Sequence, residues 1–268
     1  MNSDPPRSEA PPASPDAGAG VAILIPCFNE EATIGKVVRD FRAAAPEAKV
    51  YVYDNNSTDN SVALAREAGA IVGEEGRQGK GYVIQTMFAQ IEADVYVLVD
   101  GDDTYSAPDV GKLLRPIREG RAGMVVASRL KTHSSESFRA FHALGNWMFT
   151  TLFNLLFGAR LSDMLSGYRA LSRETVRSIT ILSGGFDVET ELTIRAIDGG
   201  ITVAEVPLPY GVRPEGSESK LRTIPDGLRV LRRMLLSGRR SRPRILIAAA
   251  ALLALIVLAA AGLTGWIG

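Results

Sequence analysis

The sequence predicts an α/β protein with a mainly parallel sheet flanked by helices, followed by a C-terminal transmembrane helix. From residue 21 to residue 237, short apolar runs alternate with helical patterns, as in a parallel sheet covered on both faces. Residues 245–267 form 23 consecutive uncharged positions. As a helix these would span about 35 Å, enough to cross a bilayer core of about 30 Å. The 268 residues suffice for one α/β domain of about 200 residues with appendages.

The elements follow in order along the chain. Residues 1–20 contain five prolines and no apolar run, so we expect a disordered tail that is not a secretory signal. Helices are predicted at 30–45 and at 61–68, the second closed by Gly69 as a C-terminal cap. Apolar runs of strand length predict strands at 21–25, 50–53, 70–72, 94–99, 123–127 and 201–206.

Two further stretches are candidate membrane-interface helices. Residues 138–157 crowd many aromatic and aliphatic side chains into one segment, which fits either a helix in the membrane interface or one buried in the core. Residues 224–236 interleave arginines with apolar residues, a pattern that anionic lipid attracts.

The charge pattern also predicts location. Four arginines precede the predicted span, at positions 239, 240, 242 and 244, and Trp266 suits the far interface. The positive-inside rule then predicts a single-pass protein of the cell membrane, with the whole domain before the span in the cytoplasm. Thirty basic and thirty acidic side chains cancel, so nothing favours nucleic acid as a partner. The single cysteine, Cys27, excludes an intrachain disulfide, and we expect it to be a packed residue rather than a nucleophile.

The most informative motif is Asp100-Gly101-Asp102 at the end of a β-branched run. Hard cations such as Mg²⁺ take one or two carboxylates together with substrate phosphates, so Asp100 and Asp102 are candidate metal ligands for Mg²⁺ or Mn²⁺. We expect Gly101 to let the backbone turn closely between them. On its own the motif is better explained as a solvated acidic turn after a strand, and the other motifs of the chain reverse that preference.

Other polar residues follow the predicted strands at the carboxyl edge of the sheet, where open α/β folds bind ligands. The first strand is followed by Pro26, Asn29 and Glu30, and the second by Asp54, which could accept hydrogen bonds from a base or ribose. Asp59 and Asn60 are better explained as helix caps. Between two glycines, Lys80 is expected on a permissive loop where it can meet a phosphate.

Together these motifs resemble family 2 glycosyltransferases of the GT-A fold, Rossmann-like in their sheet, and most closely the branch of dolichol-phosphate mannose synthases and bacterial polyprenyl-phosphate glycosyltransferases. The resemblance covers residues 21–236. It rests on P-x-F-N-E at 26–30, D-N-N-S-T-D at 54–59, G-K-G at 79–81, D-G-D at 100–102, S-R at 128–129, D-M-L-S-G-Y-R at 163–169, E-V-P at 205–207 and R-P-E-G-S-E-S-K at 213–220.

The resemblance implies roles for these residues. Asp100 and Asp102 would hold the metal and the donor diphosphate, with Gly101 between them and Lys80 nearby. Pro26, Asn29, Glu30 and Asp54 would surround the nucleoside, Arg129 and Arg139 would face a lipid phosphate, and Arg213 and Lys220 would lie over the diphosphate.

Two positions depart from the family pattern. Some members have a metal-ligating Gln where this chain has Thr104, so the third ligand could be Thr104, a water or none. The spacing from Arg213 to Lys220 is one residue longer than in the archaeal branch, which leaves the register of Lys220 open.

The implied reaction is metal-dependent transfer, with inversion, of a sugar from a nucleoside-diphosphate sugar (UDP or GDP) to polyprenyl phosphate at the membrane. A phosphate monoester is largely ionised at neutral pH, so it needs no strong base. A hydroxyl acceptor would need one, and Asp187, Glu189 and Glu191 are the candidates, unless they serve electrostatics at a helix start. A non-catalytic sugar-nucleotide-binding scaffold is the third alternative. Membrane lipids are further expected partners, and a homo-oligomer stays open.

Overall fold

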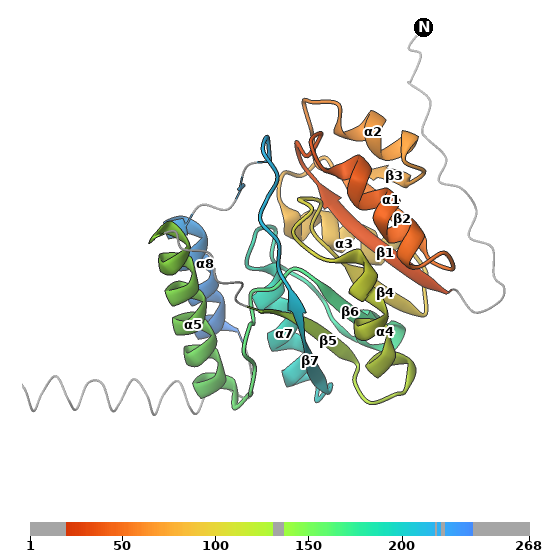
Figure 1. Ribbon diagram of the computed structural model, residues 1–268. Helices are drawn as coiled ribbons and strands as arrows, with labels where there is room; N and C mark the ends of the chain where they lie inside the picture. Colours follow the sequence, from red (N-terminus) through yellow and green to blue (C-terminus); the bar gives the residue numbers. More distant parts are fainter. Residues whose placement is uncertain (1–19, 131–136, 218, 221–222, 238–268) are drawn as a thin grey trace, which may run out of the picture.

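The computed structural model describes residues 20–130, 137–217, 219–220 and 223–237. A seven-stranded sheet in the order β3-β2-β1-β4-β6-β5-β7 lies at the centre (Figure 1). The strands are β1 (Val21–Cys27), β2 (Lys49–Asp54), β3 (Ile71–Glu74), β4 (Val95–Leu98), β5 (Met124–Leu130), β6 (Arg169–Ser172) and β7 (Val203–Pro209). Only β6 runs antiparallel to its neighbours among these strands, so the predicted mainly parallel sheet is confirmed.

Helices cover both faces of the sheet. They are α1 (Ile34–Ala44), α2 (Ser61–Glu67), α3 (Lys80–Gln90), α4 (Val110–Arg118), α5 (Ser137–Phe157), α6 (Arg173–Ser178), α7 (Val188–Asp198) and α8 (Thr223–Leu236), with a 3-10 turn η1 at Ala107–Asp109. Side chains alternate along each strand. Ile23 therefore packs with α1, α2 and α4 on one face, and Leu24 packs with α3, α6 and α7 on the other.

All six predicted strands are present, with ends displaced by at most three residues. The first helix begins at Ile34 rather than residue 30, because Glu30 and its neighbours form a turn in which the Glu30 carbonyl accepts from the Thr33 and Ile34 amides. Gly69 follows α2 with φ of +90°, as its predicted role requires. Strand β6 was not predicted, because its four residues begin with an arginine and show no strand-like alternation.

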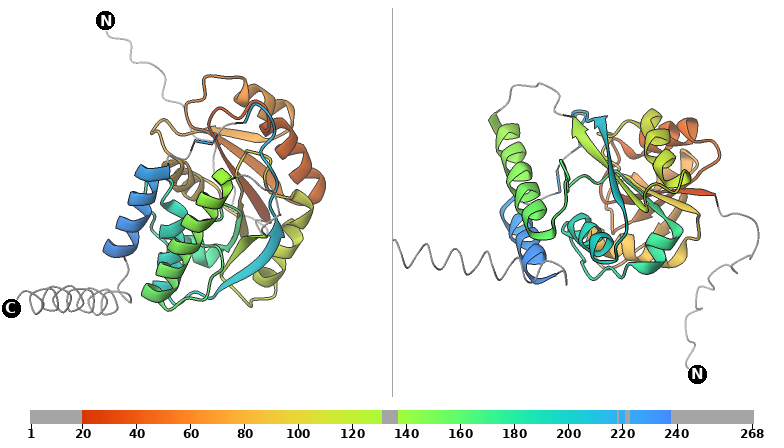
Figure 2. Two further views of the ribbon diagram at one scale, coloured as in Figure 1. Left: turned by 60° about the vertical axis from the view of Figure 1, so that its left-hand side comes forward. Right: turned by 90° about the horizontal axis from the view of Figure 1, so that it is seen from below.

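Helices α5 and α8 lie side by side at one side of the sheet (Figures 1 and 2). One face of α5 packs Phe153, Leu156 and Phe157 against α7 and α8. The opposite side of the pair exposes large apolar side chains: Trp147, Met148 and Leu155 on α5, and Leu228, Leu235 and Leu236 on α8. A helix over 138–157 is thus confirmed. Core burial and surface exposure each describe one of its faces.

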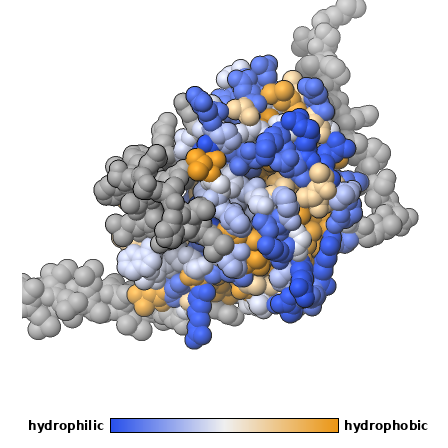
Figure 3. Space-filling view, viewed as in Figure 1, coloured by the Kyte–Doolittle hydropathy of each residue, from blue (hydrophilic) through white to orange (hydrophobic). Residues whose placement is uncertain are grey.

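Among the described residues, no helix combines the length and apolarity that a membrane crossing needs. The predicted span at 245–267, the arginines before it and the predicted tail, apart from Gly20, lie outside the described part of the chain. On the face drawn in Figure 3, hydrophilic side chains cover most of the sheet region, and apolar ones appear in small groups.

Candidate active site

Strand register collects the site at one edge of the sheet. Cys27 at the end of β1 pairs with Asp54 at the end of β2, and Leu24 pairs with Leu98 at the end of β4. The segments after these parallel strands therefore meet at the same edge. Because β6 is antiparallel, it is the loop before it, residues 163–168, that reaches this edge.

The acidic pair Asp100 and Asp102 follows β4. Asp102 is buried, and its Oδ1 accepts from the backbone N–H and the hydroxyl of Thr104. Its Oδ2 lies 2.6 Å from Nη2 of Arg213. Burial, followed by the neighbouring charge of Asp100, raises the pKa of Asp102 above its usual range. The two carboxylates thus repel each other in a partly dry environment, which favours binding of a cation between them.

Lys80 is the second cation on the acidic pair. Its Nζ lies 2.5 Å from Asp100 Oδ1 and 2.5 Å from Glu189 Oε1 of α7. Burial opposes its charge, but these two carboxylates prevail and raise the pKa of Lys80. The predicted loop position is wrong, because Lys80 is the first residue of α3. Its ammonium is engaged by carboxylates rather than standing free on a loop.

Two glycines clamp Lys80 from either side. A Cβ on Gly79 would lie 2.0 Å from the Gly184 carbonyl oxygen, and one on Gly81 would lie 2.1 Å from that of Ser183. The Gly81 N–H donates to Gly184, and the Gly79 N–H donates to Asn55 Oδ1 at 2.7 Å. Only glycine permits this close packing of two backbones, so the start of α3 is fixed against the segment before α7.

Arg213, Lys220 and Glu30 lie together beside Asp102. Burial raises the pKa of the Glu30 carboxyl to about 7, and Asp102 adds to that shift while Lys220 and Arg213 oppose it. Arg213 thus pairs with the acidic pair directly, and Lys220 acts on the neighbouring Glu30, so the predicted role of Lys220 over the diphosphate stays a prediction. Nη1 of Arg213 is buried without a hydrogen-bond partner among the described residues. A guanidinium that keeps one buried donor unused is suited to binding an anion.

The predicted nucleoside residues occupy the neighbouring loops. Asp54 is buried and accepts from the Ser57 N–H at 3.1 Å. Asn29, at φ of +52°, accepts from the Thr58 N–H at 2.8 Å and so ties the loop after β1 to the loop after β2. Pro26, still within β1, lines a narrow crevice that also contains Lys80 and Asp100.

The turn at Gly101 does not require glycine, contrary to the prediction, whereas its predicted place in the cofactor site stays a prediction. A Cβ at Gly101 would meet its nearest neighbour, the Ile34 side chain, at 3.4 Å, which is ordinary van der Waals contact. The left-handed residue of this turn is Asp103, with φ of +57°. The glycine needed here is Gly167, where a Cβ would lie 2.4 Å from Asp100 Oδ2.

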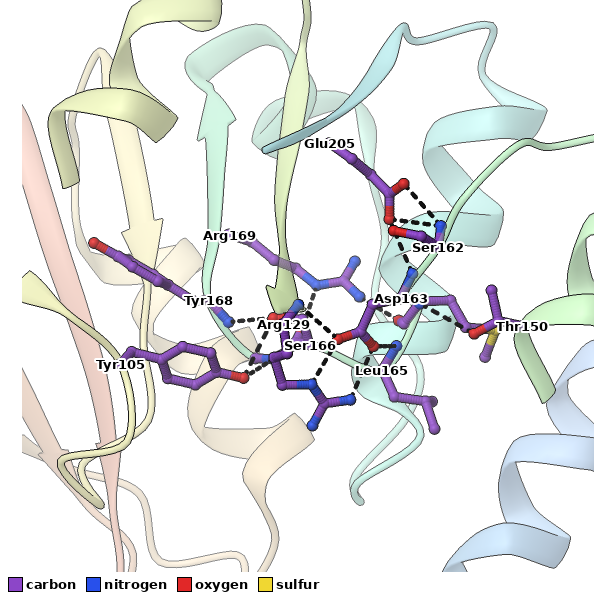
Figure 4. Close-up of polar contacts among 12 residues, drawn as sticks. Tyr105, Arg129, Thr150, Ser162, Asp163, Leu165, Ser166, Tyr168, Arg169 and Glu205 are labelled. Atoms are coloured by element: carbon purple, nitrogen blue, oxygen red, sulfur yellow. Dashed lines mark hydrogen bonds and ion pairs between the residues drawn. The ribbon is translucent and has the colours of Figure 1, made fainter. Parts of the chain in front are cut away.

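Arg129 belongs to a second polar cluster, drawn in Figure 4. Its Nε and Nη2 donate to the Asp163 carboxylate at 2.6 and 2.8 Å, and its guanidinium lies 5.3 Å from the centre of the Tyr210 ring. Glu205 of β7 accepts from the Asp163 N–H and so holds this loop in place. The backbone of Arg139 lies in α5, and its side chain lies outside the described part of the structure.

Arg169 is fully buried and holds the loop at residues 163–168 by hydrogen bonds. It donates to the carbonyls of Met164 and Ser166 and to the Thr193 hydroxyl of α7. Burial lowers the pKa of Arg169, and the charges of Glu189 and Asp163 only partly oppose this effect. This arginine positions the loop and also lines the crevice that contains Lys80 and Asp100.

The candidate bases on and before α7 are all engaged. Glu191 is fully buried and accepts from the N–H groups of Leu182 and Ser183, and Asp187 pairs with Arg233 of α8 at 2.8 Å. With Glu189 paired to Lys80, each carboxylate organises the start of the helix. This arrangement fits the alternative that these carboxylates serve electrostatics at the start of the helix rather than acting as a base.

The acidic pair fits a divalent cation as a two-carboxylate site. Within the described residues, no group of three or more histidine, cysteine, aspartate or glutamate side chains could hold a metal ion. Two carboxylates completed by water and substrate phosphates is, however, the arrangement that Mg²⁺ commonly takes. The Thr104 hydroxyl donates a hydrogen bond to Asp102, so in this structure Thr104 supports one of the two candidate metal ligands.

Three residues of the site lie in the quoted motifs, but sequence reasoning gave them no role. Asp163 pairs with Arg129, Asn55 accepts from the Gly79 N–H before α3, and Gly167 leaves room for the Asp100 side chain. Only the fold brings these partners together. Cys27 is buried as predicted, and burial raises its thiol pKa to about 12, which excludes a ready nucleophile.

The sequence was compared with known protein families. The model of glycosyl transferase family 2 matches residues 22–180, more than half of the chain. The chain belongs to family 2 of the glycosyltransferases. The fold and the family implied by the sequence motifs are thereby confirmed, and the protein is an enzyme of the hexosyltransferase type.

Two curated relatives from Haloferax volcanii are similar to this family 2 glycosyltransferase. Glycosyltransferase AglJ is 37% identical over 80% of this chain and 69% of its own length. A dolichyl-phosphate hexose transferase is 33% identical over 77% of this chain and 89% of its own. A solved structure of glucosyl-3-phosphoglycerate synthase from Mycobacterium tuberculosis, in complex with Mn²⁺ and UDP-glucose, superposes with a TM-score of 0.67 at 26% identity, covering 84% of this chain and 79% of that one.

Proposed function

We propose that this enzyme transfers a sugar, with inversion, from a UDP- or GDP-sugar to polyprenyl phosphate at the cytoplasmic face of the membrane, using Mg²⁺ or Mn²⁺. The observation that carries the donor half is the acidic pair flanked by cations, with Arg213 keeping a buried donor unpaired among the described residues. Such an edge suits a diphosphate and a divalent ion together. The mycobacterial synthase, which binds Mn²⁺ and UDP-glucose, supports this half.

Different residues bind the diphosphate, the nucleoside and the acceptor phosphate during transfer. Arg213 and Lys220 neutralise the departing diphosphate, and Glu30 and Asp54 contact the nucleoside. When bound to Asp100 and Asp102, the metal supplies further positive charge to the leaving group. Arg129 orients the attacking phosphate by charge-assisted contacts.

The engaged carboxylates around the start of α7 favour a phosphate acceptor. A hydroxyl acceptor needs a base, whereas Asp187, Glu189 and Glu191 are all held by cations or backbone N–H groups. An ionised lipid phosphate needs none. The similarity to a dolichyl-phosphate hexose transferase supports the same acceptor class.

A hydroxyl acceptor is the second candidate. Another structure of the mycobacterial synthase, 24% identical with a TM-score of 0.69, is a complex with phosphoglyceric acid. In that protein the same fold accommodates phosphoglyceric acid.

Incubating the purified full chain with UDP- and GDP-sugars, Mn²⁺ and either a short polyprenyl phosphate or phosphoglyceric acid tests the proposal. Mass spectrometry should detect a glycolipid, and the Asp102→Asn variant should not form it. Transfer only to phosphoglyceric acid would overturn the lipid-phosphate acceptor while leaving the donor half intact.

A further inference from the structure

Lys80 forms ion pairs with two carboxylates that differ in solvent exposure. Asp100 has a 30% exposed side chain at the edge of the sheet, whereas Glu189 has an 8% exposed side chain on α7 behind it. The two ion pairs have equal lengths of 2.5 Å. Asp100 is therefore the more accessible of the two carboxylates to an incoming ion.

The backbone on either side of this lysine is fixed. Gly79 and Gly81 pack against the carbonyls of Ser183 and Gly184, so any rearrangement of Lys80 occurs in its four-carbon side chain. Glu189 also acts electrostatically on buried Arg169, which lies on the inner side of the cluster. The side chain of Lys80 can thus leave Asp100 and keep its ion pair with Glu189 without moving α3 or α7.

A divalent ion on Asp100 conflicts with the present place of Lys80. The ammonium occupies an oxygen of a proposed metal ligand, and like charges at such distances repel strongly in a partly dry site. If Asp100 were the only partner of Lys80, its loss to the metal would leave a buried ammonium unpaired, at a large desolvation cost. Glu189 removes that cost, because it remains paired to Lys80.

We propose that Glu189 is a positioning residue that holds Lys80 when Asp100 is released to the divalent cation. This inference rests on the proposed metal-dependent function. Glu189 would let the acidic pair exchange the Lys80 ammonium for the metal, and it would keep Lys80 in place beside the metal. Glu189 itself touches neither the metal nor the donor.

A double-mutant cycle on Mn²⁺ affinity, measured by electron paramagnetic resonance without a sugar donor, tests the proposal. Glu189→Gln keeps the shape but weakens the hold on Lys80, so it should lower Mn²⁺ affinity about fivefold or more in the otherwise native chain. In a Lys80→Met background the same change should alter affinity by less than about twofold, because no ammonium remains to be held. Lys80→Met alone should raise Mn²⁺ affinity.

Glu30→Gln is the matched control. Glu30 acts on Asp102 through space and has no ion pair with Lys80 among the described residues, so its effect on Mn²⁺ affinity should be equal in both backgrounds. Equal effects of Glu189→Gln in both backgrounds would overturn the holding role and leave only through-space attraction. If Lys80→Met does not fold, Lys80→Gln supplies the second background under the same criteria. Absence of Mn²⁺ binding to the native chain, with and without UDP, would instead overturn the proposed metal site.

Discussion

At the residue scale, Asp102 is the side chain on which the site depends. It is buried, close to Asp100 and paired with Arg213. Asp102→Asn keeps the shape but removes the charge that would hold a cation, so we expect a loss of turnover of about 100-fold or more with little change in the melting temperature. Initial rates across a Mn²⁺ titration measure this effect.

Asp103→Asn is the matched control for that substitution. Asp103 lies in the same turn, pairs with Lys36 on the surface, and has a left-handed backbone that asparagine tolerates. Its rate should stay within about twofold of the native rate, as exposed ion pairs contribute little. Near-native turnover of the Asp102 variant at saturating Mn²⁺ would contradict the site assignment.

Glu30 predicts a pH dependence of stability. Its pKa is about 7 in the folded chain and near its usual 4.5 in the unfolded chain. The folded state therefore holds the proton more tightly, so the stability contribution is complete below pH 4.5 and is lost as the pH rises through 7. Glu30→Gln should raise the melting temperature by about 2–4 °C at pH 8 and leave it unchanged at pH 4.5. Thermal denaturation at both values decides this, and an equal shift at both would exclude titration of Glu30 as the cause.

Arg129 separates the two acceptor classes. Its removal alone would leave Asp163 buried without its cation, so the informative variant is Arg129→Gln combined with Asp163→Asn. If the acceptor is a phosphate, the KM for polyprenyl phosphate should rise at least about tenfold, while the KM for the sugar donor changes by less than about twofold. Asp163→Asn alone is the control. Unchanged acceptor kinetics in the double variant would exclude Arg129 from the acceptor site.

At the scale of elements, the start of α3 is fixed by backbone packing. Gly81→Ala would force a Cβ to within 2.1 Å of the Ser183 carbonyl, and we expect a loss of about 1–3 kcal/mol in the free energy of unfolding together with weaker donor binding. Gly101→Ala, in the sequence motif itself, meets only ordinary contacts and should be tolerated. Chemical denaturation of the two variants compares them directly. Equal destabilisation would mean that the close approach at α3 relaxes freely.

The parallel strands and the residues after them could be predicted from sequence, because alternation and β-branched runs are local signals. Asp54, Asp100 and Asp102 were placed correctly for that reason. The partners of Lys80 and Arg129 could not be predicted, since Glu189 and Asp163 come from segments more than 30 residues away along the chain. Strand β6 shows the same limit: its pairing with β4 and β5 is decided by the sheet and not by its own four residues.

At the scale of the whole molecule, ion pairs to two buried carboxylates link the helix pair α5 and α8 to α7. Arg233 of α8 contacts Asp187 and Glu191 at the start of α7, the helix that carries Glu189. The same pair of helices exposes Trp147 and Leu236 on its outer side. A surface that contacts lipid would thus lie one helix away from the residues that position Lys80.

Removing residues 238–268 tests how the molecule is attached to membranes. If residues 245–267 span the bilayer, the truncated protein should lose firm membrane association and keep only weak binding through the outer side of α5 and α8. That residual binding should weaken in high salt, because exposed Arg232 would contribute by attraction to anionic lipid. Sedimentation with vesicles that contain anionic lipid measures this residual binding.

Point substitutions test the surface of the helix pair. In the truncated chain, Leu235→Ser with Leu236→Ser should abolish binding, whereas Ile71→Ser, a substitution of an exposed apolar residue on β3, should not. Salt-resistant sedimentation of the truncated chain would show that residues 238–268 are not its anchor.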